Sequence, residues 1–226
     1  MLSTFWKGLW RLHLPEKIKF FWWQIGHNVV PVGEWLGKRG GPLGCPLCHS
    51  PIETLRHCLW DCPHAQKVWD RVTRLLAACE VEGTTSWSVA AWLDHFVDRL
   101  MDAFNVDSWC YVCMRAKIAK IRFERGLQSA SPRFPDIWML IAGFTVWYVW
   151  KARCLKVFQD LVRPPEEVIM DIWFALISCL RGQLDEVCSH SSDVGTSHLR
   201  FWQKWWNTPM VTQGGSGPRW NYQPPC

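Results

Sequence analysis

Residues 45–62 read CPLCHSPIETLRHCLWDC, and within this stretch thiols and an imidazole stand at metal-ligand spacing. Cys45 and Cys48 are separated by two residues, His57 follows after eight more, and Cys62 follows after a further four. Zinc prefers four soft or borderline ligands in a tetrahedron, and structural sites take all four from the protein. The two-residue gap lets both thiolates of the first pair turn towards one ion. The spacing predicts a structural zinc site formed by Cys45, Cys48, His57 and Cys62.

Other interpretations of the same residues remain open. Residues 45–49 also fit the Cys-x-x-Cys-His pattern of c-type haem attachment, but this leaves His57 and Cys62 without a role, and the chain begins without a signal peptide. A thioredoxin-like redox pair lacks the strand-helix-strand surroundings of that motif. Buried free cysteines are a further interpretation, which suits Cys58 and Cys79 better than the first pair. Three residues are alternative ligands within the zinc interpretation: His49, Cys58 and His64.

The composition of the 226-residue chain indicates a globular protein with a large core, because 49% of its residues are hydrophobic and 18 are tryptophan. The net charge of +5 is mildly basic, and the excess lies in residues 1–40, with six Lys or Arg against two Asp or Glu. Eleven cysteines without a signal peptide indicate a reducing intracellular compartment, nucleus or cytoplasm. The apolar run 137–150 is too short to span a bilayer, so we expect no membrane partner.

Helical periodicity dominates the pattern of apolar residues. It predicts a helix after Pro15 and another after Cys62, and we expect the apolar face of the second to pack against aromatic residues of the first. Residues 29–39 predict a short helix between them. Residues 136–159 and 165–188 predict two long helices around a proline-containing turn. In the second long helix the expected inward positions are Ile169, Ile172, Trp173, Leu176, Ile177, Leu180, Leu184 and Val187.

We therefore expect an all-α fold, in which a small zinc-knuckle module occupies residues 1–80 and a helical region occupies residues 81–210. Residues 211–226 contain a glycine-rich run and predict a flexible linker or tail. The second Cys-x-x-Cys pair, Cys110 and Cys113, has no partner pair within zinc-loop distance, so we interpret it as part of the core. The basic residues interleaved with apolar ones in residues 115–125 indicate a solvated helix face more than a nucleic-acid surface.

The combined pattern of the first third of the chain resembles a known family, the zinc-binding domain of plant reverse transcriptases. This domain lies downstream of the polymerase in LINE-like non-LTR retrotransposons. The resemblance covers roughly residues 5–75 and implies that the four predicted ligands are the zinc ligands of the family. Gln24 departs from the pattern, because relatives usually carry arginine there. The matching residues, in order, are Trp6, Trp10, the run PEKIKFFWW at 15–23, Pro31, Leu36, Arg39, Cys45-x-x-Cys48, Glu53-Thr54-x-x-His57, Cys62 and Trp69.

The resemblance implies an accessory module of a longer parent protein with polymerase and ribonuclease H domains. Residues 219–225, RWNYQPP, are similar to the lead-in of that ribonuclease H domain, and no acidic metal-binding residues follow them. We expect the chain to be no enzyme: polymerase, ribonuclease H and endonuclease active sites are not recognisable, and zinc with four protein ligands has no open position for water.

We expect the module to contact RNA or DNA, with exposed Trp or Phe stacking on unpaired bases and basic side chains on phosphates. For any single lysine, a solvated surface is the alternative explanation. Two other functions remain open, a zinc-stabilised protein-interaction module and a relic fragment without present function. The candidate nucleic-acid-binding residues are Lys17, Lys19, Lys38 and Arg39.

Overall fold

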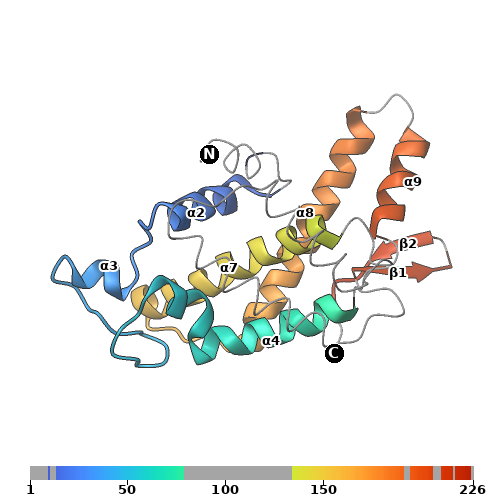
Figure 1. Cartoon of the computed structure of the whole chain (residues 1–226). Helices are drawn as coiled ribbons and strands as arrows, with labels where there is room; N and C mark the ends of the chain where they lie inside the picture. The colour runs from blue at the N-terminus through green and yellow to red at the C-terminus, as the bar shows by residue number, and fades with distance from the viewer. Residues whose placement is uncertain are drawn as a thin grey trace, which may run out of the picture.

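The structure is a computed structural model, and it describes residues 10, 14–78, 134–190, 194–205, 210–215 and 217–224. Within these residues the chain is mainly helical with one small antiparallel sheet (Figure 1), which confirms the predicted fold class. The elements in chain order are α2 (Glu16–Gly26), α3 (Gly33–Gly37), the π-helical turn η1 (His57–Asp61), α4 (Pro63–Ala78), α7 (Phe134–Gln159), α8 (Pro165–His190), α9 (Val194–Trp205), β1 (Val211–Gly214) and β2 (Gly217–Trp220).

Helix α2 begins directly after Pro15, as predicted, and buries one face. Pro15 has a φ of −55°, which is pre-organised for the start of a helix. Helix α7 comes close to this segment at Gly143, where an added Cβ would lie 3.1 Å from the Leu14 side chain. A larger residue there would push the two segments apart. The α2 residues at helical spacing are all buried: Ile18, Phe21, Trp22 and Ile25.

Helices α7 and α8 form the predicted long pair, and their ends lie within two residues of the predicted bounds. The expected apolar face of α8 is buried from Ile169 to Leu184, whereas Val187 is 40% exposed and lies beyond the core. Helix α3 is shorter than the helix predicted for residues 29–39. Of the helices in the described ranges, none is both long enough and apolar enough to cross a membrane.

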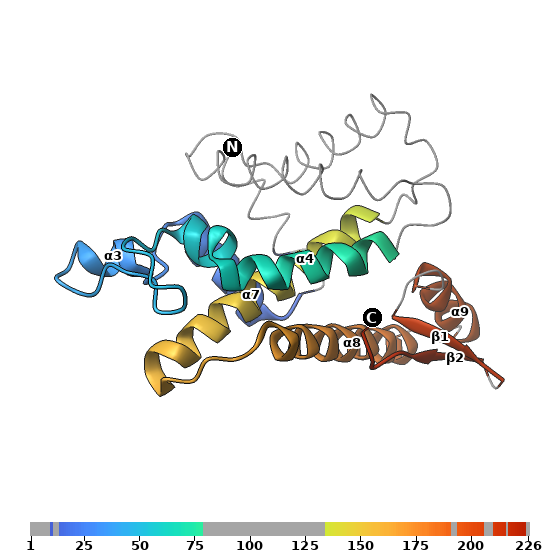
Figure 2. The same cartoon turned by 90° about the horizontal axis from the view of Figure 1, so that it is seen from below.

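Helix α7 lies between α2 and α4 (Figures 1 and 2). Helix α4 packs mainly against α7 and α8, while α2 packs against α7. The predicted packing of α4 on the aromatic face of α2 is therefore wrong about the main partner of α4. An amphipathic stripe requires an apolar surface to cover it but does not specify which one. Here α7, which carries apolar residues on most of its sides, takes the central position.

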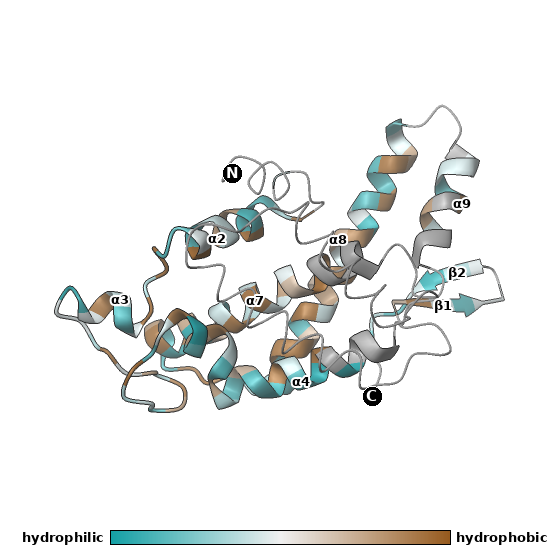
Figure 3. Ribbon diagram, in the orientation of Figure 1, coloured by the Kyte–Doolittle hydropathy of each residue, from teal (hydrophilic) through white to brown (hydrophobic). Residues whose placement is uncertain are grey.

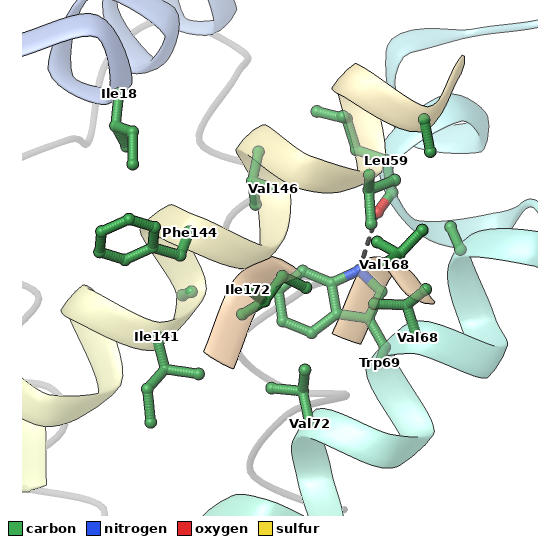
Figure 4. Packing of buried hydrophobic residues seen from close by; sticks show 14 of the residues in the cluster. Ile18, Leu59, Val68, Trp69, Val72, Ile141, Phe144, Val146, Val168 and Ile172 are labelled. Atoms are coloured by element: carbon green, nitrogen blue, oxygen red, sulfur yellow. Dashed lines mark hydrogen bonds between the residues drawn. The ribbon is translucent and has the colours of Figure 1, made fainter. Parts of the chain in front are cut away.

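One buried cluster joins the early helices to the later ones. Ile18 of α2, Val68 of α4, Phe144 of α7 and Ile172 of α8 all belong to it (Figure 4). Polar and apolar residues alternate along α4 and α8 (Figure 3), as expected for helices with one buried face. The division of the chain into three parts stays a prediction, but its first two parts share this core.

Within residues 211–226, the strands of residues 211–214 and 217–220 form a β-hairpin where the glycine-rich run predicted a flexible linker. Strand β1 pairs with β2 from Val211 opposite Trp220 to Gly214 opposite Gly217. The Trp220 ring lies 4.6 Å from the Trp202 ring of α9. The glycines that suggest a linker also serve a tight turn, since Gly217 has a φ of 113°, which side chains disfavour. A glycine-rich run therefore fits both a flexible linker and a hairpin turn, and here the contact between Trp220 and Trp202 accompanies the hairpin.

Some predicted features lie outside the described residues. They are the second Cys-x-x-Cys pair, Cys110 and Cys113, and the basic stretch 115–125.

Candidate metal centre

The four predicted zinc ligands come together in space. One ligand atom from each of Cys45, Cys48, His57 and Cys62 lies within 4.8 Å of the others. The Cys45 and Cys62 sulfurs are 3.9 Å apart, close to the roughly 3.8 Å between two sulfurs bound at about 2.3 Å to a tetrahedral zinc. The Cys48 Sγ and His57 Nε2 atoms are 3.1 Å apart, and an ion between them would open this contact to about 3.5 Å. Three thiols and one imidazole thus fit Zn²⁺.

The first ligand pair lies on a tight turn closed by backbone hydrogen bonds. The Cys45 N–H donates to the Ser50 carbonyl at 2.9 Å, and the His49 N–H donates to the Cys45 carbonyl at 3.0 Å. His49 has a φ of 61°, a left-handed conformation that histidine tolerates better than most residues. The turn holds the Cys45 and Cys48 side chains on the same side, where they meet the second pair.

The second ligand pair is positioned by a break before α4. Pro63 is the first residue of α4, and a proline disfavours helical geometry for the residue before it. Cys62 is accordingly extended, with a ψ of 131°. Its N–H donates to the His57 carbonyl five residues earlier at 2.8 Å, which closes the π-helical turn. The Thr54 hydroxyl accepts the His57 N–H at 2.9 Å and fixes the start of this turn.

Trp69 of α4 contacts the π-helical turn η1 through a hydrogen bond and a ring contact. Its indole N–H donates to the Leu59 carbonyl at 2.8 Å (Figure 4), a group for which the helix break leaves no regular partner. The ring of Trp60 lies 4.1 Å from that of Trp69. The position of the His57 and Cys62 ligands therefore depends on the docking of α4.

Backbone groups favour thiolate at two of the sulfurs. The pKa of Cys62 is lowered, first by its hydrogen bond with Cys45 and then, against the opposing effect of burial, by the N–H groups of His64 and Ala65 in the first turn of α4. The hydrogen bond with Cys62 and burial raise the pKa of Cys45, while the backbone N–H groups of Cys48 and Leu47 act in the opposite direction. A metal ion replaces that shared proton, because it binds both sulfurs as thiolates.

The three alternative ligands do not join the group. His64 Nε2 is hydrogen-bonded to the Arg163 carbonyl at 2.7 Å. Cys58 is buried, and burial raises the pKa of its thiol. His49 is exposed. Among the described residues, the cluster of metal-binding side chains consists of the four predicted ligands.

A buried ion pair connects residues 45–62, here called the zinc loop, to α7. The sequence pattern did not predict this pair. Glu53 is 0% exposed and Arg153 is 4% exposed. The Arg153 Nη2 and Nε atoms donate to the two Glu53 carboxylate oxygens at 2.8 and 3.2 Å, and the Gly33 N–H donates to the same carboxylate at 2.8 Å. Burial lowers the pKa of Arg153, but its hydrogen bond and charge interaction with Glu53 outweigh this and raise it. The motif Glu53-Thr54-x-x-His57 hints at a role for Glu53, but nothing local indicates its partner.

The two candidate phosphate-binding lysines of α2 lie in different environments. Lys17 is exposed, and its ammonium lies 5.9 Å from the Trp147 ring of α7. Lys19 is 7% exposed, and its ammonium donates to Glu16 at 2.8 Å and to the Trp10 carbonyl at 3.2 Å. Lys17 is therefore the α2 lysine that faces solvent.

The two candidates after α3 are exposed and lie side by side. The Lys38 ammonium pairs with Glu34 at 3.1 Å. The Arg39 guanidinium lies 3.6 Å from the Trp35 ring and donates to the Trp35 carbonyl at 3.0 Å. Lys17 lies on α2, whereas Lys38 and Arg39 follow α3, so these candidates occupy two separate cationic positions.

Comparison with known proteins agrees with this geometry. Residues 2–69 match the profile of a family described as zinc-binding in reverse transcriptase. A curated Arabidopsis thaliana protein that carries the name of a ribonuclease H protein is 26% identical over 162 residues, which are 70% of this chain. The match spans 21% of that relative. No solved structure matches the chain. The Cys/His cluster lies inside the matched segment, so residues 2–69 are similar to the reverse transcriptase zinc-binding family in sequence and in the side chains that could hold the metal.

Proposed function

We propose that this chain is a non-catalytic, zinc-stabilised accessory module of a retrotransposon reverse transcriptase, and that it contacts RNA or DNA. The observation that carries the proposal is the convergence of four protein ligands, Cys45, Cys48, His57 and Cys62, on one point within the matched family segment. A zinc ion with four protein ligands has no open position for water or substrate. The ion would therefore support the fold around the site and perform no chemistry.

The proposal includes a longer parent protein. The chain matches about a fifth of the length of its Arabidopsis relative, whose name refers to a ribonuclease H. The polymerase and ribonuclease H domains of such a parent would be the partners of this module, and it would work in the nucleus or the cytoplasm. A module beside these domains would meet template and product strands. The basic excess of residues 1–40 would then attract the phosphates of those strands.

The first experiment measures metal content by elemental analysis, with circular dichroism before and after chelation. We expect one zinc per chain and loss of helical signal on chelation, because metal binding and folding are coupled in small modules. A second measurement follows the binding of labelled single-stranded RNA and DNA from about 50 to about 200 mM salt, over which phosphate-based affinity falls steeply. A zinc-free chain with unchanged helicity would contradict the first part, and absence of binding at low salt would contradict the second.

One observation favours a second function, a protein-interaction module. The end of α7 and the following loop expose several apolar side chains, of which Phe158 is 79% exposed. Binding of a partner polypeptide there would be insensitive to salt and would depend on that aromatic ring. The salt series therefore separates the two functions. The other exposed apolar residues of this segment are Val157, Leu161 and Val162.

A further inference from the structure

The solvent face of α2 carries a row of stacked aromatic rings. The Phe20 and Trp23 rings are 5.5 Å apart and nearly parallel, at 13°, and the Trp23 and His27 rings are 4.2 Å apart at 29°. These residues stand three and four positions apart, so they share one side of the helix, opposite the buried residues. Phe20 is 52% exposed although it belongs to a helix that packs into the core.

Stacking makes this row stiffer than isolated surface rings. Trp23 supports the Phe20 ring from one side, and His27 supports Trp23, its Nδ1 atom lying 2.9 Å from the Trp23 carbonyl. A planar, supported ring loses little conformational freedom when another planar group stacks on it. Unpaired nucleobases are such groups, and every base offers a stacking face.

Positive charge lies next to the row. Lys17 precedes Phe20 by three residues and is therefore its neighbour on the helix surface. The Lys17 ammonium lies 5.9 Å from the Trp147 ring of α7. The acidic residue on this side of α2, Glu16, is paired with Lys19 at 2.8 Å. A strand that placed a base on Phe20 would bring a backbone phosphate towards Lys17, a combination that an apolar peptide does not use.

We propose that Phe20 and Lys17 form a contact site for single-stranded RNA or DNA, in which one unpaired base stacks on the Phe20 ring and an adjacent phosphate pairs with Lys17. This inference rests on the proposed function and names the site through which it would act. Paired bases in a duplex do not expose their faces, so the site selects unpaired strands.

The test measures the affinity of the full chain for a fluorescently labelled single strand of about 16 nucleotides by anisotropy. Phe20→Leu keeps an apolar side chain but removes the π-face, and we expect binding roughly 5- to 150-fold weaker. Phe20→Trp restores a stacking face and should bind like the unchanged chain. Phe158→Leu makes the same change at an exposed ring of α7 and should have no effect. Zinc content and circular dichroism confirm that each variant is folded.

The phosphate part of the site has its own pair of variants. Lys17→Gln should weaken binding and reduce the salt slope by about one, whereas Lys67→Gln on the exposed side of α4 should change neither. An abasic strand of the same length should bind Phe20→Leu and the unchanged chain equally. If the unchanged chain binds single strands but Phe20→Leu binds as tightly, the inference is overturned and the proposed function stands. If the unchanged chain does not bind at all, both fail.

Discussion

Cys48 is the predicted zinc ligand whose replacement best isolates the role of the metal. It is partly exposed, so its loss creates no buried cavity, and its sulfur lies 3.1 Å from the imidazole of His57. Single residues of a different kind, Glu53 and Arg153, connect the same loop to the rest of the molecule through a buried ion pair. The predicted metal centre would therefore be held in two ways, by the bound ion and by the buried pair of opposite charges.

Replacing Cys48 by Ser removes one thiolate, and a serine hydroxyl is a poor zinc ligand. Structural zinc contributes roughly 10–16 kcal/mol of apparent binding free energy in small modules, and this free energy also stabilises the fold. We expect Cys48→Ser to lose zinc and to unfold residues 1–80 together with the helices that share their core, which elemental analysis and circular dichroism would report. Cys188→Ser on α8 is the matched control and should keep the metal. Full zinc content and helicity in Cys48→Ser would remove the structural-zinc hypothesis.

Replacing Arg153 by Leu leaves the Glu53 carboxylate buried without its counter-charge. Breaking a buried pair from one side costs about 3–5 kcal/mol of unfolding free energy. Lys38→Leu removes an ion pair with Glu34 that has a similar distance but is exposed, with side chains 65% and 47% accessible. This variant should lose less than about 1 kcal/mol of unfolding free energy. Urea unfolding of both variants measures the difference. Equal costs would show that Glu53 and Arg153 do not act as a buried pair.

At the scale of elements, the zinc loop packs against the start of α3 through close backbone contacts. The Glu53 N–H donates to the Leu43 carbonyl at 2.9 Å, and the Glu34 N–H donates to the Glu53 carbonyl at 2.8 Å. Gly33 stands at the first position of α3, where an added Cβ would lie 2.1 Å from the Leu43 carbonyl oxygen. The contact of α3 with the loop therefore requires a residue without a side chain.

Replacing Gly33 by Ala should force the loop away from α3, because the colliding atom belongs to the backbone and cannot rotate aside. We expect a loss of about 1–3 kcal/mol of unfolding free energy, measured by urea denaturation. Gly182→Ala is the control for the same chemical change within α8, where an added Cβ meets nothing within 4 Å. It should stabilise the chain by up to about 1 kcal/mol through helix propensity. A neutral Gly33→Ala would contradict the observed approach.

At the scale of the whole molecule, the metal centre and the long helices share one core. Leu59 and the predicted ligand Cys62 belong to the same buried cluster as Val149 and Ala152 of α7 and Ile169 of α8. Since α7 contacts α2, α4, α8 and η1, we expect a disturbance of the zinc loop to reach helices far away in sequence. The chain is thus expected to respond to zinc as a cooperative unit.

Chelation tests this cooperativity. We expect removal of zinc to lower amide-exchange protection in residues 140–153 of α7 together with residues 63–72 of α4, because both lose the same core contacts. Hydrogen exchange followed by mass spectrometry resolves the two segments. Readdition of zinc should restore both. If α7 and α8 keep full protection while α4 loses it, the chain consists of two independent units divided near residue 80.

Local chemistry was sufficient for much of the fold and for the composition of the site. The two-residue gap between Cys45 and Cys48, and the Pro63 that follows Cys62, act over a few residues, so their consequences can be predicted from sequence. The three-four spacing in α2 and the bounds of α7 and α8 follow from helical periodicity in the same way. The zinc cofactor and the mostly helical fold were predicted on this basis and are confirmed.

The sequence by itself determined which residues face inward and which side chains suit a metal, whereas the tertiary structure decided what each face meets. An apolar stripe gains free energy against any apolar surface, so the position of α7 between α2 and α4 was not predictable. The partner of Glu53 lies 100 residues away, and no local pattern relates two such charges. The glycine-rich end forms a hairpin whose Trp220 ring lies 4.6 Å from the Trp202 ring of α9, a contact that no local pattern indicates. Each of these outcomes depends on a contact between distant segments, which exists only once the chain has folded.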